Sequence, residues 1–205
     1  MVTFLCDRRN VSKTDFLKFR CRGVVKFLNL VFSKIVKINN FDHTVDRWIK
    51  ELEQYDFVQL CAKPSPTSWS LGQVCMHLIE NTNYYVDQIK MCVSTNDNIM
   101  TEASPEAKTM FLNNEFPDEI IEGPPENLDT PQPDNKEQLI RSLINLKKDI
   151  NHVEMLILNS PYRGKTKHPG LNYFDAREWF QFADMHFRHH LRQKKRIEKF
   201  LEITR

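Results

Sequence analysis

Glycine is scarce in this sequence, and the cysteines show no spacing typical of a disulfide framework or a metal site. Only 5 of the 205 residues are glycine, and the 5 cysteines are an odd number without a C-x-x-C pair. The apolar residues instead fall in long stretches with helical spacing, which favours an all-α protein over a strand-rich one. The cysteines argue against a secreted, disulfide-stabilised domain and against a cysteine-based zinc site. We therefore expect an all-α, cytoplasmic protein.

A large net charge is also missing, although the charges are unevenly distributed. The formal net charge is +2. Residues 1–40 carry nine Lys or Arg and two Asp, whereas residues 41–205 carry twenty basic and twenty-five acidic residues. A mildly acidic body gives little support to a nucleic-acid-binding role. We expect no nucleic-acid partner, and we treat residues 1–40, the basic leader, separately.

The leader lacks the features of a secretory signal or of a membrane span. Its apolar runs are too short to cross a bilayer, and Asp7 and Asp15 interrupt the pattern of a signal peptide. Three interpretations stay open: residues 24–38 form a basic amphipathic helix on a membrane surface, the same helix lies on the body of the protein, or the leader is upstream sequence from a misplaced start. Membrane contact is the least favoured of the three. The domain itself is placed at residues 41–205.

The body of the chain has start and stop signals typical of four long helices. Ser70 and Gln73 have the form of a capping box, and Asp134 with Glu137 three residues later marks another helix start. Six of the ten prolines fall in residues 94–135, which predicts a long connection that permits a crossover. The expected helices span residues 41–60, 71–93, 135–159 and 175–202, with a short helix at 105–113 and a polar loop at 162–170.

Two histidines of the last expected helix, His186 and His190, are four residues apart, so that one helical face carries both. They lie on the stripe that otherwise faces the core. The stripe comprises Trp179, Phe182, His186, His190, Gln193 and Ile197. Buried imidazoles need partners. Each ring either hydrogen-bonds to a neighbouring helix or turns a lone pair toward a metal ion, and the spacing alone leaves both interpretations open.

The second expected helix carries a polar line at helical spacing. The line consists of Gln73, His77, Asn81 and Tyr84 or Tyr85. It favours a site in which His77 faces the other two histidines, and it is also compatible with a solvated helix face. Three imidazoles from two packed helices would leave coordination positions open, as a catalytic metal site requires.

Two segments of the chain resemble a known family. The pattern W-S-x-x-x-x-x-x-H-L at residues 69–78 resembles the start of the second helix in DinB-like (DinB/YfiT) proteins. The stretch 168–193, which begins with H-P-G and ends with H-x-x-x-H-x-x-Q, resembles their last helix. The resemblance covers about residues 41–201 in helix order and spacing and leaves out the leader. It implies an all-α four-helix bundle with a long crossover loop between the second and third helices.

The same resemblance implies a divalent transition metal ion held by His77, His186 and His190. Imidazole ligands do not decide among zinc, nickel, iron and manganese. Three neutral ligands leave the ion its full charge, so that a bound water or low-molecular-weight thiol loses a proton more easily. Family members include thiol-dependent transferases and isomerases, domains of sulfur-transfer enzymes that use non-haem iron, and proteins described as metal-dependent hydrolases.

Three polar residues are candidates for supporting roles at this site. Glu80 and Gln193 are the candidate catalytic residues, and Asn81 is the candidate for cofactor binding, each by orienting a ligand or by contacting substrate. No motif identifies a general base, although Glu80 or Glu178 could serve.

Two functions follow as hypotheses. The first is a cytoplasmic metalloenzyme, either a thiol transferase or a hydrolase, that activates a thiol cofactor or water against a small electrophilic substrate. The second is a non-catalytic interaction protein, a helical bundle that is a monomer or a homodimer, whose metal is structural or absent and whose basic leader contacts a membrane or a partner. A fourth protein ligand, for which His152 and His168 are candidates, would favour the second hypothesis.

Overall fold

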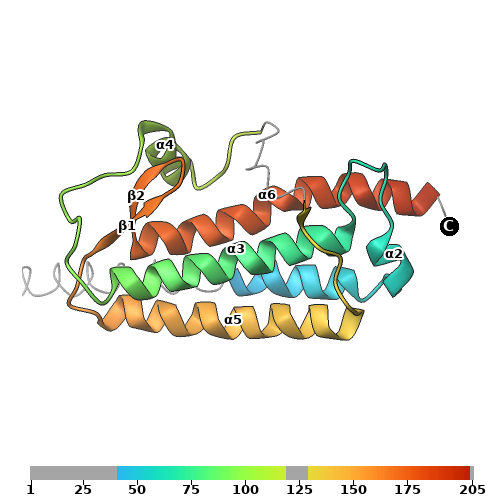
Figure 1. Ribbon diagram of the computed structural model, residues 1–205, viewed down its shortest axis with the longest axis horizontal. Coiled ribbons are helices and arrows are strands. Elements are labelled where there is room, and N and C mark those ends of the chain that lie inside the picture. The colour runs from blue at the N-terminus through green and yellow to red at the C-terminus, as the bar shows by residue number, and fades with distance from the viewer. Residues whose placement is uncertain (1–40, 119–128, 204–205) are drawn as a thin grey trace, which may run out of the picture. The chain divides into compact units, whose positions relative to one another are not determined.

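The computed structural model describes residues 41–118 and 129–203, which are mostly helical (Figure 1). The elements are a helical stretch at residues 41–52, then α2 (Phe57–Cys61), α3 (Leu71–Cys92), α4 (Pro105–Asn113), α5 (Lys136–Asn159), β1 (Lys165–His168), β2 (Asn172–Asp175) and α6 (Ala176–Ile203). The predicted leader lies outside the described residues, so its three interpretations stay open. Within the described ranges, no helix combines the length and the apolar character that crossing a membrane requires.

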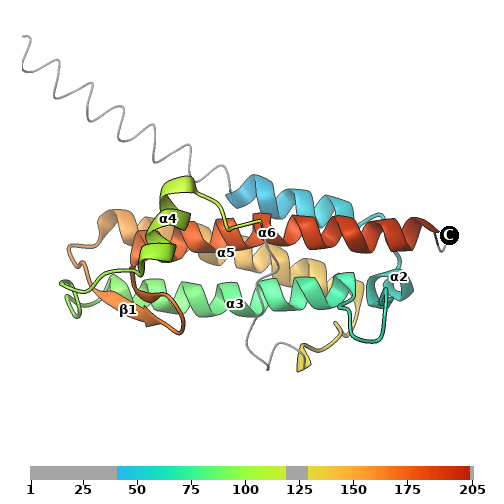
Figure 2. The ribbon, with the colours of Figure 1, turned by 90° about the horizontal axis from the view of Figure 1, so that it is seen from above.

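The long helices lie side by side, with α3 in contact with both α5 and α6 (Figures 1 and 2). The helical stretch at 41–52 reaches α6 through aromatic rings. The Phe187 ring centroid lies 5.4 Å from that of Phe41 and 6.4 Å from that of Trp48. The same stretch reaches α5 where Asn151 donates a hydrogen bond to Asp42 at 3.1 Å. Burial of these rings between the helices stabilises the core.

The first helix is shorter than the sequence pattern predicts. A single helix over residues 41–60 is wrong, because the backbone leaves the helix at residues 53–56. Asp56 then begins α2 with its own capping box, in which its carboxylate accepts from Gln59 N at 2.8 Å and its N–H donates to the Gln59 side chain at 3.0 Å. Tyr55 is nevertheless buried, with 8% of its surface exposed. The apolar spacing therefore continues through the break and could not reveal it.

The start of α3 is built as the sequence predicts. Gln73 N donates to Ser70 Oγ at 3.1 Å, and Ser70 N donates to the Gln73 side-chain oxygen at 3.2 Å. The Gln73 amide also donates to the carbonyl oxygen of Thr130 at 2.6 Å. Gln73 thus caps the helix and fastens the end of the long connection to it.

The long connection approaches α3 closely just before it enters α5. A Cβ atom on Gly72 would lie 2.8 Å from Pro133 Cδ, so only glycine leaves room for the proline ring. The short helix predicted at residues 105–113 is confirmed as α4. At the start of α5, the capping residue is Asn135 rather than the predicted Asp134, since the Asn135 side chain accepts from Gln138 N at 2.8 Å.

A small antiparallel hairpin replaces part of the predicted polar loop at 162–170. Strands β1 and β2 pair from Lys165 with Asp175 to His168 with Asn172. Phe174 is fully buried, and the Trp179 indole N–H donates to Thr166 Oγ1 at 2.8 Å. These strands are four residues each and form against α6, so their pairing depends on packing that a local sequence pattern does not contain.

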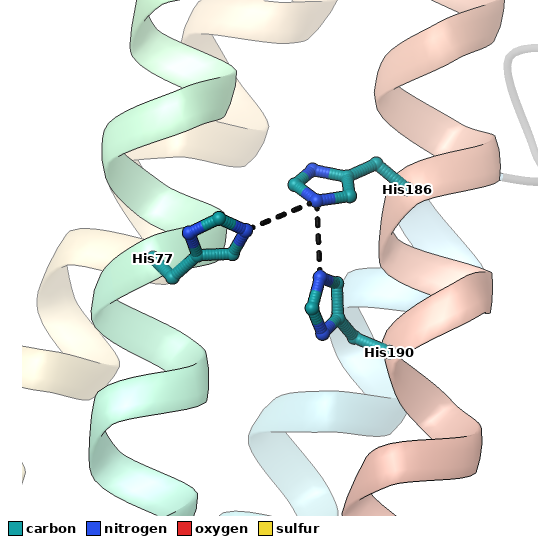
Figure 3. Close-up of side chains that lie close together, drawn as sticks. All are labelled: His77, His186 and His190. Carbon is teal, nitrogen blue, oxygen red and sulfur yellow. Dashed lines mark hydrogen bonds between the residues drawn. The ribbon is translucent and has the colours of Figure 1, made fainter. Parts of the chain in front are cut away.

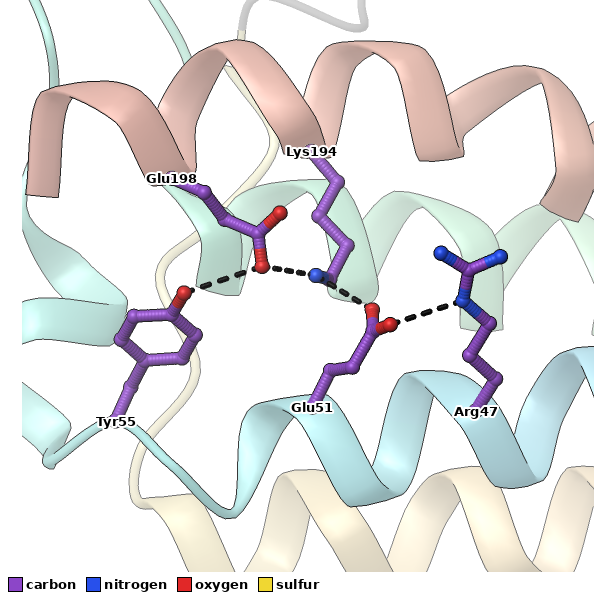
Figure 4. Close-up of polar contacts among 5 residues, drawn as sticks. All are labelled: Arg47, Glu51, Tyr55, Lys194 and Glu198. Atoms are coloured by element: carbon purple, nitrogen blue, oxygen red, sulfur yellow. Dashed lines mark hydrogen bonds and ion pairs between the residues drawn. The ribbon is translucent and has the colours of Figure 1, made fainter. Parts of the chain in front are cut away.

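A buried lysine links the first helical stretch to α6 (Figure 4). The Lys194 side chain is only 2% exposed, and its Nζ lies 2.6 Å from a Glu51 carboxylate oxygen and also pairs with Glu198. Tyr55 donates to the same Glu198 at 3.1 Å, and Arg47 pairs with Glu51 at 2.9 Å. The charges alternate in sign along this chain of contacts, which compensates the buried ammonium.

Candidate metal centre

Three buried histidines from two helices meet between α3 and α6 (Figure 3). His186 and His190 lie one turn apart on α6, and His77 faces them from α3. His186 Nε2 lies 3.2 Å from His77 Nε2 and 3.0 Å from His190 Nε2. Within the described ranges, no other group of three histidine, cysteine or acidic side chains brings its ligand atoms this close together.

Burial keeps the three imidazoles neutral. Their exposed fractions are 6% for His77, 7% for His186 and 9% for His190. Desolvation lowers the pKa of His77 to about 4 and that of His190 to about 3, and it lowers the pKa of His186 well below its usual value. Near pH 7 each ring therefore has one bare nitrogen lone pair, which is the form that binds metal ions.

Hydrogen bonding among the three rings cannot satisfy all of their nitrogens. A neutral ring nitrogen carries either one N–H or one lone pair, yet His186 Nε2 is close to two other nitrogens. A tetrahedral ion bound at about 2.0–2.1 Å would separate its ligand nitrogens by roughly 3.3–3.4 Å, which is near the 3.0 and 3.2 Å found here. The residues present thus fit a divalent ion bound by three nitrogens.

Two amide side chains contact the outer nitrogens of the cluster. The Gln193 side-chain oxygen lies 2.8 Å from His190 Nδ1 and accepts a hydrogen bond from its N–H group. The Asn81 side-chain nitrogen lies 3.1 Å from His77 Nδ1 and donates to the carbonyl oxygen of His77 at 2.9 Å. His186 Nδ1 is buried and has no hydrogen-bond partner among the described residues. The structure therefore places Asn81 beside His77 and Gln193 beside His190, and their supporting roles stay predictions.

The two glutamates considered as general bases are placed elsewhere. Glu80 is exposed on the outer side of α3. Glu178 caps α6, where its carboxylate accepts from Asp175 N at 2.8 Å, and burial raises its pKa. Within the described part of the chain, neither side chain hydrogen-bonds to one of the three histidines.

The histidines considered as a fourth ligand do not join the cluster either. His152 is exposed on α5. His168 lies in β1, and its Nδ1 accepts from Gly170 N at 3.1 Å. His189, next to His190 in sequence, lies against Phe116 with ring centroids 5.3 Å apart. The residues described here thus provide three protein ligands and no fourth.

Aromatic rings surround the three histidines. The Trp69 centroid lies 4.9 Å from that of His77 and 6.5 Å from that of His190. Tyr85 and Phe116 approach His186 at 5.9 and 6.0 Å. Of the two tyrosines left open by the sequence, Tyr85 is the buried one, and Tyr84 is 42% exposed. Phe116 had no role in the sequence prediction, because an apolar residue in a proline-rich connection gives no indication of its neighbours.

A comparison with models of known protein families finds a match. The family model of the DinB superfamily matches residues 40–193, a span that contains all three histidines and Gln193. A search of the curated proteins finds no match.

Proposed function

This chain belongs to the DinB superfamily, and from that premise we propose that it is a metal-dependent enzyme in which His77, His186 and His190 hold one divalent transition metal ion. The observation that carries the proposal is the convergence of three buried, neutral imidazole rings, each with one ring nitrogen within 4.8 Å of those of the other two. Hydrogen bonding alone would leave His186 Nε2, which lies close to two other ring nitrogens, able to satisfy only one of them.

The proposed architecture around the site is a four-helix bundle. Its members are the stretch at 41–52, α3, α5 and α6, and the connection between α3 and α5 is the crossover. Contacts of α3 with α5 and α6, and of Phe41 and Trp48 with Phe187, support this arrangement. In this bundle α3 and α6 are neighbours, so the helix faces that carry the histidines are turned toward each other.

The proposed chemistry is the activation of a nucleophile. A bound zinc, nickel, iron or manganese ion supplies a positive charge that favours the deprotonated form of water or of a low-molecular-weight thiol. Among the chain's own residues, Gln193 holds the proton of His190 at Nδ1, which turns the lone pair of Nε2 toward the cluster. Trp69, Tyr85 and Phe116 form apolar surroundings that suit a small, weakly polar electrophile.

Thiol transfer and hydrolysis remain the two forms of this function, with a small molecule as substrate. The non-catalytic interaction protein would be favoured by a fourth protein ligand, and neither His152 nor His168 provides one. We therefore do not propose it. A homodimer and a cytoplasmic location stay predictions from the sequence.

Elemental analysis of protein purified without an affinity tag tests the proposal. Wild type offered zinc, nickel, iron and manganese in turn should retain about one equivalent of at least one of them, as a single three-histidine site requires. His186→Ala should lose it, while His152→Ala, a change at an exposed histidine of α5, should retain it. Absence of metal from wild type, or equal retention by His186→Ala, would show that the proposal is wrong.

A further inference from the structure

The Asn81 side chain makes two contacts with the same histidine. Its amide nitrogen lies 2.9 Å from the backbone carbonyl oxygen of His77 and 3.1 Å from His77 Nδ1. A carbonyl oxygen can only accept a hydrogen bond, so the atom that faces it is the amide NH2 group and not the amide oxygen. The contact with the backbone therefore fixes which end of the amide faces the ring.

This orientation decides where the proton of His77 lies. An amide nitrogen donates and does not accept, so its contact with Nδ1 is favourable only when Nδ1 has a bare lone pair. The neutral ring then carries its proton on Nε2, the nitrogen that points toward His186 (Figure 3). A nitrogen that carries a proton cannot give a lone pair to a metal ion.

Gln193 has the opposite effect on His190. Its side-chain oxygen accepts from His190 Nδ1 at 2.8 Å, which leaves the lone pair on His190 Nε2. With these two tautomers, His186 Nε2 can satisfy only one neighbour. If His186 Nε2 carries a lone pair, it accepts a hydrogen bond from His77 Nε2 but faces the lone pair of His190 Nε2. If it carries a proton, it donates to His190 Nε2 but faces the proton of His77 Nε2. The three rings without an ion therefore keep one unfavourable contact.

We propose that Asn81 is a positioning residue that holds His77 in the tautomer opposed to metal binding, so that the Asn81 amide must turn before an ion can bind at all three histidines. This inference rests on the proposed metal site. Turning the amide brings its oxygen to His77 Nδ1 and gives up its bond to the His77 carbonyl. The ring loses the proton of Nε2 to water and takes one up at Nδ1, so it stays neutral. Asn81 thereby lowers the metal affinity of the site, and His77 joins as the last ligand.

Metal affinities of matched variants test this role by the direction of their change. Asn81→Leu removes the amide at similar volume, and Asn81→Asp leaves a group that only accepts. Measured by competition with a chelator, the zinc affinity of Asn81→Asp should exceed that of wild type by about 10- to 100-fold, the usual size of outer-partner effects. Asn81→Leu should bind zinc at least as tightly as wild type.

Gln193→Leu is the matched control, because it removes the conventional partner of His190. Its zinc affinity should fall by about 10- to 100-fold. If Asn81→Leu weakens zinc binding as Gln193→Leu does, Asn81 is an ordinary orienting residue and the inference is overturned. Thermal unfolding of each variant, followed by circular dichroism, identifies any that fail to fold.

Nitrogen NMR of the metal-free protein provides a test that needs neither activity nor an ion. In 15N-labelled wild type, His77 should be protonated at Nε2, and in Asn81→Asp the proton should move to Nδ1. Protonation at Nδ1 in metal-free wild type would overturn the inference, whether or not the protein binds metal. Protonation at Nε2 in a protein that takes up no metal would instead overturn the proposed function and leave the effect of Asn81 on the ring intact.

Discussion

Glu154 is a buried carboxyl group of α5 whose surroundings make stability depend on pH. It is 8% exposed, and burial together with the nearby charge of Asp42 raises its pKa to about 7 from a usual value of 4.5. Between about pH 4.5 and pH 7 the folded protein therefore binds this proton more tightly than the unfolded chain does. The contribution of Glu154 to the free energy of unfolding consequently falls as the pH rises through that window.

Glu154→Gln should remove this pH dependence. At pH 8 the variant should be more stable than wild type by about 1–2 kcal/mol, less than the full shift would give because water still screens part of the carboxyl group. At pH 4.5, where the native carboxyl is protonated, the two proteins should differ little. Urea unfolding at both pH values measures the difference. An equal gain at both would mean that packing, and not ionisation, is responsible.

Residue-level features of the site were predictable to the extent that they depend on helical spacing. The separation of four residues between His186 and His190 places both on one face, and a second polar line contains His77 and Asn81. The direction in which the Asn81 amide points depends on a backbone carbonyl of its own helix, and the approach of Phe116 depends on the path of a loop. Neither leaves a periodic signal in the sequence.

Lys194 of α6 connects this helix to the first helical stretch through an ion pair. Its ammonium group is almost fully buried between Glu51 and Glu198. Removing one member of a buried ion network leaves the charges of the other members uncompensated. The resulting loss of stability is larger than the net stabilisation that the intact ion pairs provide. The contact thus limits how far α6 can shift relative to the stretch at 41–52.

Lys194→Met should destabilise the protein by about 2–4 kcal/mol, somewhat below the usual cost of a fully buried pair because both glutamates remain partly exposed. Lys195→Met, a change at the exposed neighbouring lysine, should alter stability by no more than about 0.5 kcal/mol. The free energy of unfolding in urea measures both effects. A Lys194 variant as stable as the Lys195 variant would contradict a stabilising role of the network.

Element boundaries were predictable where a side chain caps the backbone locally. Ser70 and Gln73 mark the start of α3, and α4 lies where Pro105 begins a short helix. The break before α2 was missed although Asp56 and Gln59 have the spacing of a capping box, because the apolar spacing continues past them and favoured a single helix. The hairpin was also missed, since four-residue strands that form against α6 carry too few positions to show alternation.

The core, the Lys194 network and the histidine cluster together represent the largest scale of the described structure. The buried core, the Lys194 network and the three histidines are all formed by residues within 41–203. The sequence predicts one domain over residues 41–205 from its four long helical segments. The leader differs from it in charge and composition.

A fragment of residues 41–205 should therefore fold by itself. Its circular dichroism should show a folded helical domain, its Tm should lie within about 5 °C of the full chain's, and its metal content should equal that of the full chain. Circular dichroism, thermal unfolding and elemental analysis provide the comparison. An unfolded fragment, or one that loses the metal which the full chain holds, would show that the leader is part of the domain.

The proposed metal site takes two of its three donors from one helix, because His186 and His190 stay one turn apart as long as α6 is helical. Folding adds His77 as a third donor at high effective concentration, without any new chemistry on α6 itself. If the three histidines hold an ion, its affinity therefore depends on how firmly α3 is held against α6. Loosening of this helix pair, even far from the histidines, would appear as loss of metal before it appeared as loss of helix.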